Sequence, residues 1–306
     1  MKTVYLTLIL VLQAGGFWEQ LAPTQRQTLA AQAVDPAVVQ TTAPAPPPLT
    51  AMGPWPVQLA ANPIRISAAS ALAVDVASGT ILYNQDGNRK LPIASITKLM
   101  TALVVLSHHN LTDTITIPDL PAYRPEDERI GLVAGESYQL QDLLRALLIQ
   151  SANDAADALA IANAGSIAKF AARMNAKLGE WHITGARFVS PSGLVDDGNF
   201  ATADALTKIA RLVLTNSFLR QTVSEATATI KSTAGRTINL QTTNQLLASG
   251  NFYGIKTGYT QAAGECFVGL TRIDGHEVVT VVLGASDRFG DSQTLANWIS
   301  RTWQWL

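Results

Sequence analysis

The chain of 306 residues is apolar and nearly neutral. Hydrophobic residues make up 47% of it and charged residues only 15%, and 22 basic against 23 acidic residues leave a net charge of −1. This balance gives no support to nucleic-acid binding, which needs a basic surface. A single cysteine, Cys266, excludes an internal disulfide framework and a zinc site built on cysteines. The composition is that of a globular enzyme or binding domain with a large core.

The first 18 residues have the pattern of an export segment. Lys2 is followed by an uncharged stretch whose apolar centre runs from Val4 to Leu12. A positive start and a short apolar run are typical of a secretory signal, and the run is shorter than the roughly 20 residues of a membrane span. Because residues 12–14 make a poor cleavage site, residues 1–18 are predicted to be a signal peptide or an N-terminal anchor. Either would place the folded part outside the cytoplasm, in the periplasm or on the outer face of the membrane.

A linker rich in proline and alanine is predicted at residues 19–65. Nine of the 14 prolines lie at or before Pro63, and no charged residue stands between Asp35 and Arg65. Proline runs favour an extended polyproline conformation, which packs neither as helix nor as sheet. We therefore expect a tether, followed by one folded domain at residues 66–306.

The pattern of the folded domain changes along the chain. A strand hairpin is predicted first, at 71–76 and 81–84. Apolar residues at helical spacing then predict helices at 95–107, 140–149, 153–163, 167–178 and 202–215. Further strands are predicted at 227–231, 237–241, 254–256, 265–271 and 278–283, before a closing amphipathic helix at 291–305. Since strands come from both ends, the simplest assembly is an α/β (α+β) fold with an antiparallel sheet from both chain ends and a helical insertion.

Several familiar catalytic motifs are missing from the sequence. The four histidines, His108, His109, His182 and His276, lie at a helix end or in polar turns, and no Gly-x-Ser-x-Gly turn is present to accompany them. There is also no His-Glu-x-x-His pair and no Gly-x-x-x-x-Gly-Lys phosphate loop. We therefore expect chemistry without a metal or a cofactor.

A Ser-x-x-Lys motif, Ser95-Ile96-Thr97-Lys98, stands at the start of the first predicted helix. Its spacing puts the serine and lysine side chains on one helical face, one turn apart. Lys98 can accept the proton of Ser95 only when it is neutral. Lowering a lysine pKa by about three units costs roughly 4 kcal/mol, which burial and a neighbouring cation can supply. A serine at a helix start also has a backbone N–H aimed where an oxyanion would form.

Order and context separate this motif from chance repeats. The same pattern recurs at Ser166–Lys169, and Ser151-Ala152-Asn153 has a counterpart at Ser249–Asn251. Ser95 follows a loop that enters a helix, whereas Ser151 lies at a bend between two predicted helices. Lys256-Thr257-Gly258 occurs once and ends a strand, where glycine lets a substrate approach the backbone.

Ser-x-x-Lys, Ser-x-Asn and Lys-Thr-Gly in this order resemble the penicillin-recognising serine acyltransferases. The neighbouring residues narrow the resemblance to low-molecular-mass D-alanyl-D-alanine carboxypeptidases, through Ala94–Ala102, Gly135-Glu136, Ser151–Ala156 and Gly254–Thr260. It extends from about residue 70 to residue 306 and implies a β-lactamase/transpeptidase-like fold with a helical subdomain. It also implies a hydrolase that trims peptidoglycan stem peptides through an acyl-enzyme and is inhibited by β-lactam antibiotics.

The resemblance implies a role for each motif residue in the reaction. Ser95 would be the acylated nucleophile and Lys98 its base. Ser151 would relay a proton to the leaving amine, and Asn153 would hold the peptide of the substrate. Lys256 would supply the cation that keeps Lys98 neutral and helps to hold the substrate.

Further residues are implied to bind the substrate around the scissile bond. Thr257 and Arg288 would bind the terminal carboxylate, with Arg288 taken from the weaker Gly284–Arg288 stretch. The backbone N–H groups of Ser95 and Tyr259 would form the oxyanion hole, beside the small Gly258.

Three alternatives remain open on the sequence. A D,D-endopeptidase has the same fold, and it too lacks the extra β-rich domain that some relatives carry after the catalytic domain. A class A β-lactamase shares the three motifs but needs a glutamate in a Glu-x-x-Leu-Asn motif, and no such motif follows Ser151. A wall- or β-lactam-sensing module that is acylated without turnover is the third.

Two departures from the family pattern are expected to matter little. Ser192 stands where relatives often have histidine, and we expect little effect on the chemistry. The tryptophans of the closing helix, Trp298, Trp303 and Trp305, are interpreted as core and rim residues and not as a membrane anchor. The only membrane attachment expected is through the N-terminal apolar segment.

Overall fold

The computed structural model describes residues 54–60, 62–194 and 198–306. The chain divides into two units, Met1–Met52 and Gly53–Leu306, and all described residues belong to the second. The predicted export segment at 1–18 and most of the predicted linker therefore lie outside the described residues. Among the described residues, no helix is long and apolar enough to cross a membrane.

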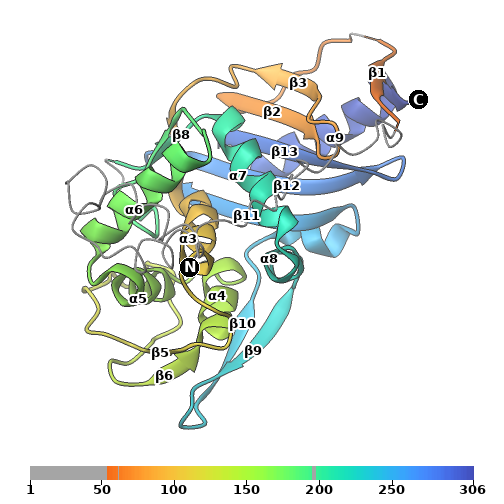
Figure 1. The fold of residues 1–306 in the computed structure, drawn as a ribbon. Coiled ribbons are helices and arrows are strands. Elements are labelled where there is room, and N and C mark those ends of the chain that lie inside the picture. The colour runs from red at the N-terminus through yellow and green to blue at the C-terminus, as the bar shows by residue number, and fades with distance from the viewer. Residues whose placement is uncertain (1–53, 61, 195–197) are drawn as a thin grey trace, which may run out of the picture. The chain divides into compact units, whose positions relative to one another are not determined.

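A five-stranded antiparallel sheet lies at the centre of the fold (Figure 1). Its strands are, in spatial order, β11 (Phe252–Thr260), β12 (Gly264–Ile273), β13 (His276–Ala285), β2 (Ser70–Asp75) and β3 (Ile81–Gln85). The pair Val281↔Leu72 joins the two ends of the domain in one sheet. This confirms the predicted antiparallel sheet from both chain ends.

The two faces of the sheet have separate cores because successive strand residues point to opposite faces. Leu72 and Val74 of β2 belong to the main core beneath the helices. Ala73, between them, packs with Leu295 and Ile299 of the last helix. Every residue of β2 is buried, which accounts for its nearly continuous apolar sequence.

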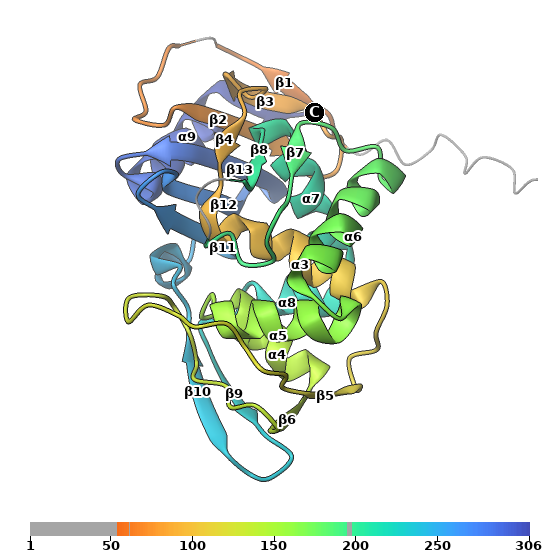
Figure 2. The ribbon, with the colours of Figure 1, turned by 90° about the vertical axis from the view of Figure 1, so that its left-hand side faces the viewer.

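The helices cover the sheet and form the predicted insertion. Helices α7 (Ala203–Thr215) and α9 (Arg288–Thr302) lie on opposite faces of the sheet (Figure 1). The others gather around α3 on the side of α7 (Figure 2). They are η3 (Ala94–Ile96, a 3₁₀ turn), α3 (Thr97–Leu106), α4 (Leu140–Leu148), α5 (Asn153–Ala164), α6 (Ile167–Glu180) and α8 (Ser217–Thr222).

Short strands and one turn complete the described chain. Two ribbons are β5 (Thr114–Thr116) with β6 (Ser137–Gln139), and β9 (Thr227–Lys231) with β10 (Thr237–Gln241). The β9–β10 ribbon projects beyond the helices (Figure 2). A small sheet pairs β4 (Leu91–Pro92), β8 (Phe200–Ala201) and β7 (Ala186–Arg187), and a 3₁₀ turn, η4 (Gln245–Ser249), precedes β11.

The ends of the domain differ from the sequence prediction. The linker is predicted to reach residue 65, and within that range β1 (Pro56–Gln58) pairs with β14 (Trp303–Trp305). The closing helix, predicted to reach residue 305, instead ends at Thr302. Trp305 stacks on His276 with ring centroids 4.9 Å apart, and this contact holds the extended end against the sheet.

Candidate active site

Ser95 lies in η3, at the sharp entry of the chain into α3. The residue before it, Ala94, has a left-handed φ of 47°, a conformation that a non-glycine residue rarely adopts. Lys98 follows in the first turn of α3 and is fully buried. Its Nζ donates a hydrogen bond to Ser95 Oγ at 2.8 Å, so the two side chains meet as the motif spacing predicted.

Lys98 is surrounded by hydrogen-bond acceptors. Besides Ser95 Oγ, its Nζ contacts Asn153 Oδ1 and the backbone oxygen of Ser192, both at 2.8 Å. The side chain of Ser192 takes no part, which explains why its departure from the family pattern is compatible with this contact. All three contacts hold Nζ beside the serine hydroxyl.

The pKa of Lys98 is lowered to about 7 by burial. The carboxylates of Asp157, Glu128 and Asp154 act in the opposite direction and keep that pKa from falling further. A lysine with a pKa near 7 is neutral in about half of the molecules at pH 7, against about 0.04% for an exposed lysine. Lys98 is therefore poised to take up a proton at neutral pH.

Ser151 and Asn153 stand at the predicted bend between α4 and α5. Ser151 is buried and has a left-handed φ of 62°, so the chain turns there and α5 begins at Asn153. This turn aims Asn153 at Lys98. The hydroxyl of Ser151 has no hydrogen-bond partner among the described residues.

Lys256, Thr257 and Gly258 lie on β11, the edge strand of the sheet. Lys256 is fully buried, and its pKa is lowered well below the usual value by burial and then by the positive charges of Lys98 and Arg288. A side chain at Gly258 would lie 2.9 Å from Ile93 O and 3.2 Å from the backbone nitrogen of Ile96. Glycine is therefore what lets β11 lie directly against the turn that carries Ser95.

Arg288 begins α9 and reaches back to the same strand. Its Nη1 donates to Gly258 O at 2.9 Å, and its guanidinium lies over the Phe289 ring, 4.9 Å from the centroid. Its Nε is buried without a hydrogen-bond partner, and its side chain forms no ion pair among the described residues. The site thus holds a cation beside Gly258 with a further N–H free to donate.

A recess of about 320 Å³ opens beside Ser95. Asn153, Gly193 and Tyr259 line it, and Tyr259 is 64% exposed at its rim. Its far wall is formed by four charged residues, Arg124, Glu126, Asp127 and Glu128. The predicted site residues lie at this recess, on β11 or at the α4–α5 bend, or contact a residue there.

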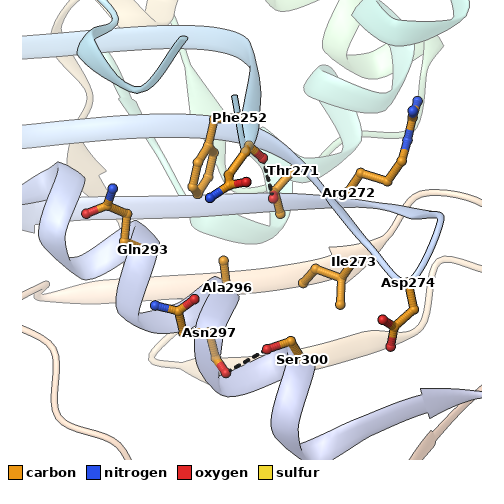
Figure 3. A pocket seen from close by; sticks show the side chains of 10 residues that line it. Phe252, Thr271, Arg272, Ile273, Asp274, Gln293, Ala296, Asn297 and Ser300 are labelled. Atoms are coloured by element: carbon orange, nitrogen blue, oxygen red, sulfur yellow. Dashed lines mark hydrogen bonds between the residues drawn. The ribbon is translucent and has the colours of Figure 1, made fainter. Parts of the chain in front are cut away.

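A larger recess, of about 460 Å³, lies between α9 and the ends of β11 and β12. Figure 3 shows its lining, which includes Phe252, Gln293, Asn297 and Asp274. None of the motif residues reaches it. Side chains positioned for proton transfer, and not the size of the recess, therefore identify the candidate site.

The repeated motifs have structural explanations. Ser166 caps α6 by accepting a hydrogen bond from the backbone nitrogen of Lys169 at 3.2 Å, so the second Ser-x-x-Lys pattern is a helix cap. Ser249 and Asn251 form a turn after η4, where the Asn251 backbone nitrogen donates to Ser249 Oγ. Neither pattern lies at the recess beside Ser95.

Sequence reasoning missed residues that act on the site from distant segments. Thr243 Oγ1 lies 2.5 Å from Thr257 Oγ1 and fixes the orientation of that hydroxyl. Asn199 Nδ2 donates to Thr97 Oγ1 at 3.0 Å. Glu128 brings a negative charge close to both buried lysines. None stands in a recognisable motif, so only the fold brings them to the site.

No group of three or more His, Cys, Asp and Glu side chains that could hold a metal ion occurs in the described part of the chain.

The family model for D-alanyl-D-alanine carboxypeptidase matches residues 57–287. The chain belongs to the D-alanyl-D-alanine carboxypeptidase family. The match covers the sheet, the helical insertion and the three motifs, and it ends directly before Arg288. As a member of this family the protein is a hydrolase, and its fold is that of the D,D-transpeptidases and β-lactamases.

Curated relatives and solved structures agree with this assignment. The chain is 32% identical over 235 residues to D-alanyl-D-alanine carboxypeptidase DacB2 of Mycobacterium tuberculosis, covering 74% of this chain and 80% of that protein. It is 34% identical over 244 residues to D-alanyl-D-alanine endopeptidase of Escherichia coli, covering 76% and 77%. The ampicillin-bound penicillin-binding protein D2 of Listeria monocytogenes superposes with a TM-score of 0.67 at 30% identity, covering 78% and 100%.

Proposed function

We propose that this protein is a serine-type D,D-carboxypeptidase that removes the terminal D-alanine of peptidoglycan stem peptides through an acyl-enzyme on Ser95. The observation that carries the proposal is the contact of Lys98 Nζ with Ser95 Oγ at 2.8 Å, combined with the pKa of about 7 that burial gives Lys98. A base of this pKa works at neutral pH without a histidine. The family assignment supplies the substrate class.

Acylation begins with neutral Lys98. The ammonium form of Lys98 donates to Ser95 Oγ, whereas the neutral amine has two hydrogens and one lone pair. Neutral Nζ can therefore donate to Asn153 and Ser192 O while accepting the proton of Ser95 Oγ. Oγ then attacks the carbonyl carbon of the penultimate D-alanine. The proton passes from Lys98 through Ser151 to the amide nitrogen, the C–N bond breaks, and D-alanine leaves as the amine.

Deacylation reverses these roles with water. Lys98 takes a proton from the water, whose oxygen attacks the ester carbon, and the same proton returns to Ser95 Oγ as the ester bond breaks. In both steps the backbone N–H groups of Ser95 and Tyr259 would stabilise the oxyanion.

The substrate carboxylate would bind at β11. Arg288 lies beside Gly258 with a buried, unpartnered Nε, and Thr257 presents a hydroxyl that Thr243 orients. Charge-assisted hydrogen bonds from an arginine to a carboxylate are short and strong. They would place the scissile bond over Ser95.

The role proposed for Lys256 is the one expected from the sequence, a positive charge that favours neutral Lys98. Burial lowers the pKa of both lysines most. The positive charges of Lys98 and Arg288 lower the pKa of Lys256 further, and repulsion between the two lysines acts on both. Two buried lysines that repel each other titrate as a pair, so protonation of Lys98 during the reaction favours neutral Lys256.

A D,D-endopeptidase activity is the second candidate, because a relative of that name is 34% identical to this chain. In cross-linked peptidoglycan the group beyond the scissile bond also ends in a carboxylate on a D-configured carbon, so the same cation can receive it. Mass spectrometry of the products from a pentapeptide and from a cross-linked dimer separates the two activities. Cleavage of the pentapeptide alone supports the carboxypeptidase, and cleavage of the dimer alone supports the endopeptidase.

We further propose that the enzyme works outside the cytoplasm and is inhibited by β-lactams. The apolar run Val4–Leu12 supports export, and residues 19–53 would act as a tether. The ampicillin-bound structure of a related protein supports acylation by β-lactams. The proposed partner is peptidoglycan. The near-neutral net charge of −1 gives no support to nucleic-acid binding.

Labelling with a fluorescent penicillin tests the nucleophile. The wild-type protein should be labelled and Ser95→Ala should not, because among the described residues Ser95 is the serine whose hydroxyl contacts the buried Lys98. Ser166→Ala is the matched control, since it alters the other Ser-x-x-Lys motif, and it should be labelled normally. Labelling of Ser95→Ala would show that the nucleophile is another residue.

A further inference from the structure

Asp154 is a buried carboxylate whose hydrogen bonds come from backbone N–H groups. It is 2% exposed and forms no ion pair among the described residues. It accepts from the backbone nitrogens of Ile130 at 3.1 Å, Gly131 at 2.8 Å, Leu132 at 3.0 Å and its neighbour Ala155 at 3.0 Å. Burying a carboxylate is costly unless such bonds satisfy it, so these four bonds account for a charge at this position.

Three of these donors belong to one loop, residues 123–132, which has further ties to α5. The backbone nitrogen of Asn153 donates to Glu128 O at 2.8 Å. Tyr123 OH donates to Asp157 Oδ2 at 2.7 Å. The first five residues of α5 therefore hold both ends of the 123–132 loop and its middle.

Fewer contacts to the 123–132 loop are described from segments other than α5. Ile130 and Leu132 pack on the main core, and Arg236 donates from the surface to Gly131 O at 2.9 Å. The stretch between Tyr123 and Ile130 is mostly charged and exposed, so it has little apolar area to hold it in place. Its position depends on Asp154 and the neighbouring ties.

This loop forms the far wall of the recess beside Ser95. Arg124, Glu126, Asp127 and Glu128 line it, whereas Thr257 and Arg288 do not. On the proposed function, those two residues bind the leaving D-alanine. The recess is then the place for the part of the peptide that precedes the scissile bond.

We propose that Asp154 is a positioning residue that fixes the 123–132 loop against α5 and thereby sets the wall that confines the acyl part of the peptide. This role rests on the proposed function. Asn153, one residue earlier, contacts Lys98, while Asp154 accepts hydrogen bonds from the loop. One turn of helix thus connects the base of the reaction to the surface that receives the substrate.

The test is Asp154→Asn, studied with a soluble pentapeptide that ends in D-alanyl-D-alanine. The amide keeps the shape of the carboxylate but turns hydrogens toward N–H donors, so the loop loses bonds. The assay is run at about pH 9, where Lys98 is neutral whether or not Asp154 carries its charge. KM should then rise at least about tenfold while kcat stays within about threefold, because the chemistry at Ser95 and Lys98 is kept and only binding is lost. Hydrogen exchange at residues 130–132 should speed up, with no change at Leu159–Ala164 of the same helix.

Two further variants keep the proposal falsifiable. Asp204→Asn is the matched control, since Asp204 is also the second residue of a helix but pairs with Lys208 at the surface, and it should leave KM unchanged. Tyr123→Phe removes a single tie and should raise KM by about threefold with the fold intact.

The outcomes separate this proposal from the proposed function. If wild type cleaves the peptide and Asp154→Asn keeps its KM within about twofold, the positioning role is wrong. A fall in kcat at constant KM, or faster exchange along the whole of α5, would also overturn it. If wild type does not cleave the peptide at all, the proposed function fails, and the exchange at residues 130–132 still decides whether Asp154 holds the loop.

Discussion

At the scale of single residues, burial gives Lys98 a pKa of about 7, close to that of an ordinary histidine. Three oxygen acceptors surround its Nζ, and removal from water lowers its pKa to about 7. The pKa lies about 3.5 units below that of an ordinary lysine, which corresponds to roughly 5 kcal/mol of differential interaction between the two protonation states. The carboxylates of Asp157, Glu128 and Asp154 limit the shift, so the pKa stays near neutral pH and does not fall far below it.

The acylation rate should therefore rise with pH through an apparent pKa near 7, because the neutral lysine is the base. Asp157→Asn should shift this rising limb of the pH–rate profile to lower pH. Asp157 carries the charge that raises the pKa of Lys98 most, and its own pKa of about 6 leaves it ionised at neutral pH. The measurement is the rate of penicillin acylation from about pH 5 to 9.

Asp142→Asn serves as the control for the pH profile. Asp142 pairs with Arg145 on α4 and is not among the charges that act on Lys98, so its variant should keep the wild-type limb. A flat profile, or a limb that Asp157→Asn leaves in place, would contradict the assignment of Lys98 as the base.

Arg288 is predicted to recognise the substrate carboxylate. Removing a buried charged partner costs about 2–5 kcal/mol, or roughly 30- to 4,000-fold in rate. A pentapeptide with an amidated C-terminus should lose kcat/KM on that scale. Arg288→Ala should lose a similar amount on the acid and little more on the amide.

Arg272→Ala is the control for this substrate comparison, since Arg272 is an exposed arginine that lies over Tyr253 away from Ser95. It should leave both substrates unaffected. Equal rates on the acid and the amide would mean that the carboxylate is not what the site binds.

At the scale of elements, the site is assembled by the close approach of backbones. A side chain at Gly193 would lie 1.9 Å from Ala94 O, and one at Gly258 would lie 2.9 Å from Ile93 O. Two glycines thus allow a loop and a strand to pack on both sides of the turn that carries Ser95. The turn itself is fixed by this packing more than by its own sequence.

Gly193→Ala should reduce penicillin acylation at least about tenfold, because its side chain must displace Ala94 and with it Ser95. Gly165→Ala isolates the conformational cost. Both glycines have a left-handed φ, +76° and +78°, but nothing lies within 4 Å of the position that a side chain would take at Gly165.

Both glycine variants should lose about 1–2 kcal/mol of stability from the left-handed conformation. Only Gly193→Ala should also lose acylation, measured with fluorescent penicillin beside the melting temperature. Equal acylation by the two variants would show that the approach of residue 193 does not position Ser95.

The sequence predicted local elements well and distant contacts poorly. Helices and strands follow apolar periodicity, and the Ser95–Lys98 contact follows from helix geometry alone. The contact of Thr243 with Thr257 could not be predicted, because the two lie on separate segments and neither stands in a pattern for such a pair. The four N–H groups at Asp154 were missed for the same reason, since backbone donors leave no mark in the sequence.

At the scale of the whole molecule, the two ends of the folded domain meet in the β1–β14 pair. Trp55 and Leu306 exchange backbone hydrogen bonds at 2.9 and 3.1 Å, and the backbone nitrogen of Leu59 donates to Thr302 O at 2.7 Å. The proline-rich sequence favoured a linker and so did not predict this strand. Pro56 is nevertheless compatible with a strand, because proline, which has no N–H to donate, is tolerated at the first residue of a strand. We therefore propose that the folded domain begins near residue 54 and not at residue 66.

A chain of residues 54–306 should be as stable as the full-length protein, whereas residues 66–306 should be less stable by about 2–5 kcal/mol. Each lost backbone hydrogen bond contributes about 0.5–1.5 kcal/mol, and the removed segment makes several. Thermal unfolding of the two truncated chains measures the difference. Equal melting temperatures of the two truncated chains would show that the folded domain begins at residue 66.

The central claim is that Ser95 carries the acyl group while a terminal D-alanine is removed. It is tested most directly by mass spectrometry of wild type and Ser95→Ala incubated with a pentapeptide that ends in D-alanyl-D-alanine. Wild type should release the tetrapeptide and free D-alanine, with the trapped acyl group mapped to Ser95, and Ser95→Ala should release neither. Cleavage at another bond, an acyl group on another serine, or release of D-alanine by Ser95→Ala would contradict the account.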